Sequence, residues 1–361
     1  MSRSRALASS ILFAGGASVA LASMGCANST AAETSDAGAS DDGDAAVSRI
    51  ADAASDAMID SGRASSLGGR AFIAHDISLG DVGPDGGADP NAWSTVGADI
   101  DGQDTGADSG SSCSLALGAS TDVQIDGENG IDNSFAKNVL PIFASLGGSD
   151  FSASLTSSIE SGGPTLMIDV QGLTDDPSQT ASSLDAQLLS VVHSGARPTW
   201  DGTDSWDVYM SSLIDGAISK GARARFSASS IASGVWSNGL AGDVPLTLAF
   251  GGVSIDVVVH HATVSFRHDG AHHASGGVVA GVINTSDFLA GLQPLFKQIG
   301  ACPYTYALNP EIEAASDIMD DGTNTSGVAC NAISIGIGFT ADEALSPNSV
   351  TGDPIPGSAC P

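Results

Sequence analysis

Alternating apolar and polar positions after residue 112 predict a domain built mainly from β-strands. Leu166, Ile168 and Val170 alternate with polar neighbours, which is the two-residue period of a strand with one buried face. Similar patterns predict further strands at residues 188–192, 246–250, 253–266, 277–283 and 332–339. The spacing of these strands favours antiparallel pairing through short turns.

The longest alternating stretch predicts a tight hairpin followed by an irregularity. Two glycines at residues 251–252 separate two alternating runs, and a connection of two residues is typical of a tight hairpin. After Val259 the apolar positions shift by one and resume at Ala262. Because side chains alternate strictly along a strand, a bulge or a bend is required at His260 and His261.

Helical spacing is limited to three short segments. Residues 135–146 place four apolar side chains on one stripe, and Asn133 or Ser134 can cap the start of this helix. A shorter stripe covers residues 151–159, and a helix with an internal proline is expected at residues 286–299. The predicted fold is therefore mainly β, an antiparallel β-sandwich-like domain with a few peripheral helices.

Composition divides the chain into a signal, a linker and a single domain. Residues 1–26 begin with two arginines and continue with small apolar residues, which is typical of a secretion signal. Residues 27–112 are mostly Ala, Asp, Gly and Ser, so we expect a disordered tether with too little apolar surface to fold. We interpret its apolar patch, residues 71–77, as flexible coil, and residues 113–361 as one β-rich domain.

The signal ends in a sequence that resembles a bacterial lipoprotein box, where the cysteine becomes the lipidated first residue. Residues 23–26 read Ser-Met-Gly-Cys, and Gly25 and Cys26 fit this pattern, although Ser23 and Met24 are uncommon in it. We expect lipid on Cys26. Ordinary cleavage after a small residue such as Ala27 is the alternative.

The number of cysteines supports this expectation. The chain has five, and exported proteins usually pair their thiols, so an odd number leaves one to explain. Lipid on Cys26 leaves four cysteines for two disulfides, and we expect Cys113 to pair with Cys360 and Cys302 with Cys330. Zinc binding by these four is the less favoured alternative because no C-x-x-C pair occurs.

Charge restricts the partners. The chain carries 42 acidic residues against 12 Lys and Arg, a net charge of −30, which repels nucleic acid. We therefore expect no nucleic-acid partner and predict attachment to a membrane through the N-terminal lipid. The expected location is the outer membrane or the cell surface, and the alternatives are the periplasm and the medium.

One acidic segment has the composition of a calcium loop. Asp126, Glu128 and Asp132 place carboxylates around glycines just before the first predicted helix. Calcium takes six to eight oxygen ligands from flexible loops, so these three residues are candidate ligands. The segment is not an EF-hand, and an acidic turn that favours the helix N-terminus is the alternative that we prefer.

Two tryptophans lie close together in residues 200–206. Trp200 and Trp206 flank Asp201 and Asp204, and indoles beside carboxylates suit stacking on a sugar ring with added polar contacts. The two indoles can equally anchor a long loop on the domain, and we favour this structural role.

Three histidines surround a predicted turn at Asp269 and Gly270. His268, His272 and His273 can converge with Asp269 on a metal ion. Solvated turn histidines are the alternative that we prefer.

Motifs of the common enzyme classes are absent from the sequence. It contains no GxSxG elbow, no HExxH pair and no nucleotide-binding glycine loop. We therefore expect a non-enzymatic domain that binds an envelope or extracellular ligand, either carbohydrate or protein. The alternative is a secreted hydrolase that acts on polysaccharide through carboxylates near Trp200 and Trp206.

Three stretches resemble a group of exported proteins of myxobacterial type that has no assigned activity. They are residues 126–133, residues 200–206 and residues 330–339, and the resemblance covers most of residues 113–345. It implies a secreted or lipid-anchored domain on a tether and carries over no catalytic residue.

Overall fold

The computed structural model describes residues 69–83, 86–106, 112–146, 150–195, 197–250, 253–354 and 357–361. The predicted signal, Cys26 and the first part of the predicted tether lie outside the described residues. Of the two units into which the chain divides, every described residue belongs to the second, the compact unit Asp60–Pro361.

Strands dominate the described residues. They are β1 (Gly69–Ser78), β2 (Thr165–Gln171), β3 (Ala181–His193), β4 (Trp206–Tyr209), β5 (Ala224–Ala232), β6 (Val235–Ser237), β7 (Gly242–Phe250), β8 (Val253–His268), β9 (His273–Asn284), β10 (Ala332–Ala344) and β11 (Ser349–Thr351).

These strands form one sheet that closes on itself. The order along the sheet is β11-β4-β3-β2-β1-β10-β9-β8-β6-β5, and β5 also pairs with β3. The length of β3 makes this closure possible, because residues 181–188 pair with β5 and residues 191–193 pair with β4. We call the run from β3 through β1 and β10 to β5 the closed sheet. All its pairings are antiparallel.

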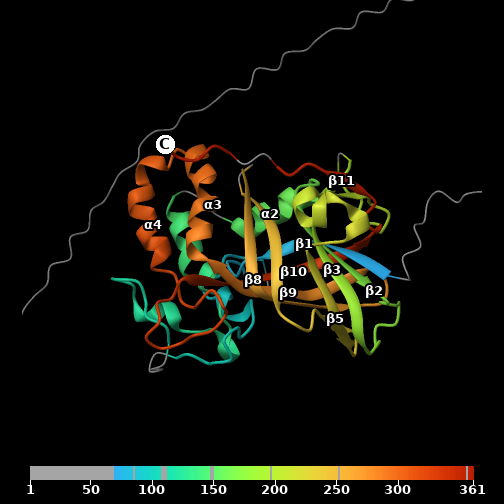
Figure 1. The fold of residues 1–361 in the computed structure, drawn as a ribbon, viewed down its shortest axis with the longest axis horizontal. Helices are drawn as coiled ribbons and strands as arrows, with labels where there is room; N and C mark the ends of the chain where they lie inside the picture. The colour runs from blue at the N-terminus through green and yellow to red at the C-terminus, as the bar shows by residue number, and fades with distance from the viewer. Residues whose placement is uncertain are drawn as a thin grey trace, which may run out of the picture. The chain divides into compact units, whose positions relative to one another are not determined.

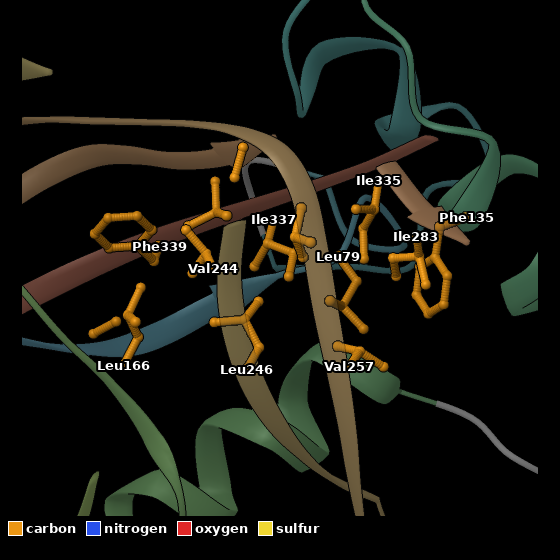
Figure 2. Packing of buried hydrophobic residues seen from close by; sticks show 14 of the residues in the cluster. Leu79, Phe135, Leu166, Val244, Leu246, Val257, Ile283, Ile335, Ile337 and Phe339 are labelled. Carbon is orange, nitrogen blue, oxygen red and sulfur yellow. The ribbon is translucent and has the colours of Figure 1, made fainter. Parts of the chain in front are cut away.

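The main hydrophobic core lies inside the closed sheet. Phe72 of β1 and Phe266 of β8 approach within 5.3 Å between ring centroids, although β10 and β9 separate their strands in the sheet. Opposite parts of the sheet therefore face each other, and the mainly β, sandwich-like class predicted from the sequence is confirmed. Figure 2 shows part of this packing, in which Ile335 and Ile337 of β10 belong to the same cluster as Val244, Leu246 and Val257 of the β7–β8 hairpin.

The described helices are few. α1 (Leu140–Ser145) follows the π-helical turn Phe135–Val139, and α2 (Phe151–Glu160) packs on β1. α3 (Thr285–Gln298) contacts β8 and β9, and α4 (Thr305–Glu313) lies beside α3 near the C-terminus in Figure 1. The predicted helices at residues 135–146, 151–159 and 286–299 are thus confirmed. The Asn133 side chain accepts a hydrogen bond from Ala136 N, as expected for a cap.

A second, smaller core covers the outer face of the closed sheet. Ile73 of β1 and Met167 of β2 point outward, because their strand neighbours Phe72 and Ile168 point into the main core. The segment from Trp200 to Ala222 packs over these outward residues. Strands such as β1 are therefore apolar on both faces, which removes the alternation expected of a half-buried strand.

The predicted irregularity in β8 is present. His261 has a φ of 51°, and the register between β8 and β9 shifts between His260 and Thr263. Phe250 pairs with Val253, which is the register of the predicted hairpin, while the two glycines between them lie outside the described residues.

The expected boundary between tether and domain was wrong. Gly69–Ser78 is not flexible coil but β1, paired with β2 on one edge and β10 on the other. Phe72 and Ile73 are fully buried, and residues 86–106 also have described structure. The small and acidic residues around the patch concealed a strand whose burial comes from distant parts of the chain.

The four cysteines after Cys26 form two disulfides, but the predicted connectivity was wrong. Cys113 pairs with Cys330, and Cys302 pairs with Cys360. A parallel bridge between Ser114 and Ala329 brings Cys113 to Cys330, while the C-terminal segment runs back to the start of α4. The spacing of the cysteines along the chain does not indicate which two of them lie close together in the fold.

In the part of the chain that the structure describes, no helix combines the length and the apolar character that a membrane crossing requires.

Candidate functional site

Three neighbouring strands bring two histidines and an aspartate together on the outer face of the closed sheet. Asp342 of β10 pairs with His273 of β9 on one side and with Ile73 of β1 on the other. Cross-strand partners point to the same face, and His75 lies two residues beyond Ile73 on β1. We call His75, His273 and Asp342 the histidine triad.

The carboxylate of Asp342 lies between the two imidazoles. Its Oδ2 is 2.8 Å from His75 Nε2, and its Oδ1 is 2.9 Å from His273 Nδ1. One ligand atom from each of the three residues lies within 4.8 Å of the others. The side chains of His75, Asp342 and His273 are 16%, 22% and 42% exposed, so the triad is open to solvent on the His273 side.

The outer side of the His75 ring is also held. Its Nδ1 lies 3.5 Å from Asp76 Oδ1, and Thr340 Oγ1 donates a hydrogen bond to Asp76 Oδ2 at 2.9 Å. The half-buried Trp200 indole packs against the imidazole, with the ring centroids 4.8 Å apart. These contacts restrict rotation of the His75 side chain.

A separate ion pair lies beside the triad. Arg70 contacts both oxygens of Glu343, which also accepts a contact from His272. Arg70 and His272 hold the pKa of Glu343 below its usual value despite its partial burial. Glu343 therefore stays ionised and is already engaged by two cationic or donor groups.

The Trp200–Trp206 loop has a structural role in the fold. Trp206 is 1% exposed and packs against Trp200, with ring centroids 5.6 Å apart. The buried Asp204 carboxylate accepts hydrogen bonds from the backbone N–H groups of Thr199 and Trp200. Asp201 is exposed and accepts from Thr203 within its own turn. Trp206 thus offers no exposed face for a sugar.

The predicted acidic loop meets a second acidic loop that the sequence analysis assigned to the tether. Carboxylate oxygens of Asp99, Asp101 and Asp132 lie within 4.8 Å of one another. Asp132 is buried and accepts a hydrogen bond from Ile100 N at 2.7 Å. Asp126 accepts from Thr105 N, whereas Glu128 is exposed and is not part of this group.

Burial changes the ionisation of these carboxyls. Loss of hydration, reinforced by neighbouring carboxylates, raises the pKa of Asp132 to about 9. Burial likewise raises the pKa of Asp126 to about 6 and that of the fully enclosed Asp317 to about 7. The positive charge of Lys137 interacts with the carboxylates of Asp126 and Asp317. Its ammonium group donates hydrogen bonds to the backbone carbonyl oxygens of Asp122 and Ile125.

The three histidines predicted around the Asp269 turn do not converge. His268 is 1% exposed, and burial lowers the pKa of its imidazole. His272 contacts Glu343, and only His273 belongs to the histidine triad. His75 and Asp342 were not predicted as site residues because they come from strands far apart in the chain. One pattern in the sequence could have indicated them. Each lies in a pair of adjacent polar residues near the end of an apolar strand, His75-Asp76 in β1 and Asp342-Glu343 in β10.

No protein-family model matches the chain, and no curated protein or solved structure matches it either. The resemblance to exported proteins of myxobacterial type therefore stays a prediction, and the residues themselves carry the functional argument.

Proposed function

We propose that this chain is an exported envelope protein, anchored by lipid on Cys26, whose folded domain binds a ligand and does not catalyse a reaction. The observation that carries the export proposal is the pairing of all four later cysteines in disulfides. Disulfides persist in oxidising compartments, and their pairing leaves Cys26 as the one cysteine for lipid. The proposed location is the outer membrane or the cell surface, with the periplasm or the medium as alternatives.

The carboxylates near Trp200 already accept hydrogen bonds from neighbouring groups, which favours a binding function over polysaccharide hydrolysis. A glycosidase needs two carboxyl groups facing one cleft, roughly 5 to 10 Å apart. Asp204 is buried and occupied by backbone donors, and Asp201 is bonded within an exposed turn. The histidine triad, by contrast, lies at the surface and is exposed on the side of His273. We infer that an envelope or extracellular ligand is recognised at such a surface.

Mass spectrometry of the mature N-terminus tests the anchor. We expect the first residue to be Cys26 carrying the mass of a diacylglyceryl group, with the protein in the membrane fraction. The control Cys26→Ala should move the protein to the soluble exported fraction. An unmodified N-terminus downstream of Cys26 would retire the lipid anchor.

Incubation with soluble polysaccharides tests the hydrolase alternative. We expect no release of reducing ends by the exported chain. Release that disappears in Asp201→Asn, while the exposed control Asp215→Asn keeps it, would favour the hydrolase.

The proposal includes a calcium ion at the acidic loops. Asp99 and Asp101 add two carboxylates to Asp132, one of the ligands suggested by sequence, and hard oxygen donors from two loops suit calcium. A bound cation would also offset the cost of burying Asp132 as an ion.

Thermal unfolding with calcium and with a chelator tests this part. Because calcium would bind only the folded state, it should raise the melting midpoint, and Asp101→Asn should abolish the rise. The control Asp104→Asn alters an exposed carboxylate outside the cluster and should keep the rise. Equal midpoints with calcium and with chelator would remove calcium from the proposal.

A further inference from the structure

We infer that the histidine triad binds a divalent transition metal of the zinc type, with His75 Nε2, His273 Nδ1 and a carboxylate oxygen of Asp342 as its three protein ligands. This inference names a ligand for the proposed binding domain and rests on that proposal. Its chemistry differs from that of the acidic loops, which offer only oxygen.

The positions of the ligand atoms fit a metal shell. In a tetrahedral site with bonds of 2.0 to 2.1 Å, neighbouring ligand atoms lie about 3.3 Å apart. The contacts of Asp342 with His75 and His273, at 2.8 and 2.9 Å, are slightly shorter than this. Small side-chain shifts would therefore admit an ion between the three groups.

The donor set selects the class of metal. Imidazole nitrogens suit zinc, copper, nickel and iron, whereas calcium and magnesium prefer oxygen alone. Two histidines and one carboxylate also form a common ligand set of zinc sites that keep an open position. The exposed side of the triad, next to His273, would leave such a position for water or for a ligand atom.

The surroundings of His75 resemble those of metal-bound histidines, although its Nδ1 lies 3.5 Å from Asp76 Oδ1, beyond a normal hydrogen bond, and Thr340 Oγ1 lies 3.5 Å from the proposed ligand atom Nε2. Such a histidine usually directs its second nitrogen at a carboxylate, which fixes the tautomer that leaves a lone pair for the metal. His75 Nδ1 faces Asp76, whose other oxygen is held by Thr340, and Trp200 packs against the ring. The ring is thus oriented by contacts that do not involve the proposed ion.

Neighbouring residues that could also coordinate a metal are already engaged, which leaves His75, His273 and Asp342 as the protein ligands. Glu343 is engaged by Arg70 and His272, so it is not free to coordinate. The four cysteines beyond Cys26 are in disulfides and offer no thiolate. Zinc bound to this chain is therefore expected at the triad.

Isothermal titration with zinc chloride tests the inference on the exported chain carrying Cys26→Ala, so that no free thiol competes. A millimolar excess of calcium chloride occupies the acidic loops during the titration. We expect one zinc ion per chain. His273→Asn and Asp342→Asn should each weaken binding by at least about 10-fold, the range seen even for supporting residues.

His260→Asn is the matched control. His260 Nδ1 contacts Asp243 Oδ1 at 3.0 Å, so this pair repeats the histidine–carboxylate contact without a third ligand. The control should bind zinc like the parent chain. His273 is 42% exposed, so His273→Asn should keep its melting midpoint in chelator, which shows that a loss of zinc binding is not unfolding.

Two results would overturn the inference: no saturable zinc binding by the parent chain, or equal binding by the parent, His273→Asn and Asp342→Asn. In either case Asp342 serves only to hold two imidazoles on the sheet. Neither result affects the proposed lipid at Cys26 or the choice between binding and hydrolysis. Those proposals are tested separately, by mass spectrometry of the N-terminus and by incubation with polysaccharides.

Discussion

Arg70 Nε lies 2.9 Å from Glu343 Oε1, and Arg70 Nη2 lies 2.7 Å from Glu343 Oε2, so the pair joins β1 to β10 through two parallel contacts. The Arg70 side chain is 7% exposed and that of Glu343 is 20% exposed. Burial distinguishes this ion pair from that of Arg225 and Asp185, which is also bidentate but exposed. It links the strand nearest the N-terminus to one close to the C-terminus.

Glu343→Gln should destabilise the domain. The change keeps the shape of the side chain but removes its charge and one acceptor oxygen, so that the exposed Asp175 is the remaining carboxylate in contact with the buried Arg70 guanidinium. We expect the free energy of unfolding in urea to fall by about 3 kcal/mol. The control Asp185→Asn breaks an exposed pair and should cost less than about 1 kcal/mol. Equal losses in the two variants would contradict this ranking.

Removal of β1 should abolish folding. A chain that begins at residue 113 lacks the strand between β2 and β10, and therefore exposes two unpaired edges and the main core. We expect circular dichroism to show no cooperative thermal transition for it. A chain that begins at Asp60, the start of the second compact unit, should keep the transition. A cooperative transition in the shorter chain would disprove the assignment of β1 to the core.

The disulfide connectivity can be read from peptides. Digestion without reduction should yield one cross-linked peptide containing Cys113 and Cys330 and another containing Cys302 and Cys360. The separations of 217 and 58 residues predict entropic contributions of about 5 and about 4 kcal/mol. Double serine variants should therefore both lose stability, with the larger loss for Cys113 and Cys330. A peptide joining Cys113 to Cys360 would contradict the fold.

Asp317 should make stability depend on pH. Burial raises its pKa to about 7 in the folded state, so the folded chain holds a proton that the unfolded chain releases near pH 4. The contribution is complete below pH 4, and the free energy of unfolding should decrease as the pH rises from about 4 to about 7. Asp126 and Asp132, whose pKa values burial also raises, act in the same direction, Asp126 up to about pH 6 and Asp132 up to about pH 9. The lowered pKa of Lys137 acts in the opposite direction and only at alkaline pH.

Asp317→Asn should make the decrease between pH 4 and 7 less steep, measured as urea midpoints at several pH values, with Asp126 and Asp132 supplying the remainder. The amide stays neutral, so its protonation no longer changes with unfolding. The control Asp321→Asn removes an exposed carboxyl whose pKa is lowered by hydrogen bonds from Thr323, and it should leave the decrease between pH 4 and 7 in place. An unchanged profile in Asp317→Asn would show that the carboxyl is ionised when folded.

Local patterns were sufficient where apolar and polar residues alternate along a strand, although β2 turned out to be buried on both faces. The alternation around Ile168 predicted β2, and the shift of apolar positions after Val259 predicted the irregularity at His261. In both cases the period of a half-buried strand is a local property. The favoured structural role of Trp200 and Trp206 agrees with the burial of Trp206, whereas the burial of Asp204 was not predicted.

Features set by distant contacts were not predictable from the sequence. β1 lies among small and acidic residues that resemble a linker, and its burial depends on β2 and β10. The histidine triad needs the pairing of β1, β10 and β9, which no spacing along the chain encodes. The disulfide partners depend on the same long-range topology. Asp99 and Asp101 were missed because their segment was assigned to the tether.

The place of β10 also determines when the domain can fold during synthesis. Its residues belong to the last 30 of the 361-residue chain, yet it lies between β1 and β9. A nascent chain without β10 therefore has unpaired edges on β1 and β9, where another chain can add. The closed sheet therefore cannot form before β10 is present, and the interval before that is when these edges are most open to aggregation.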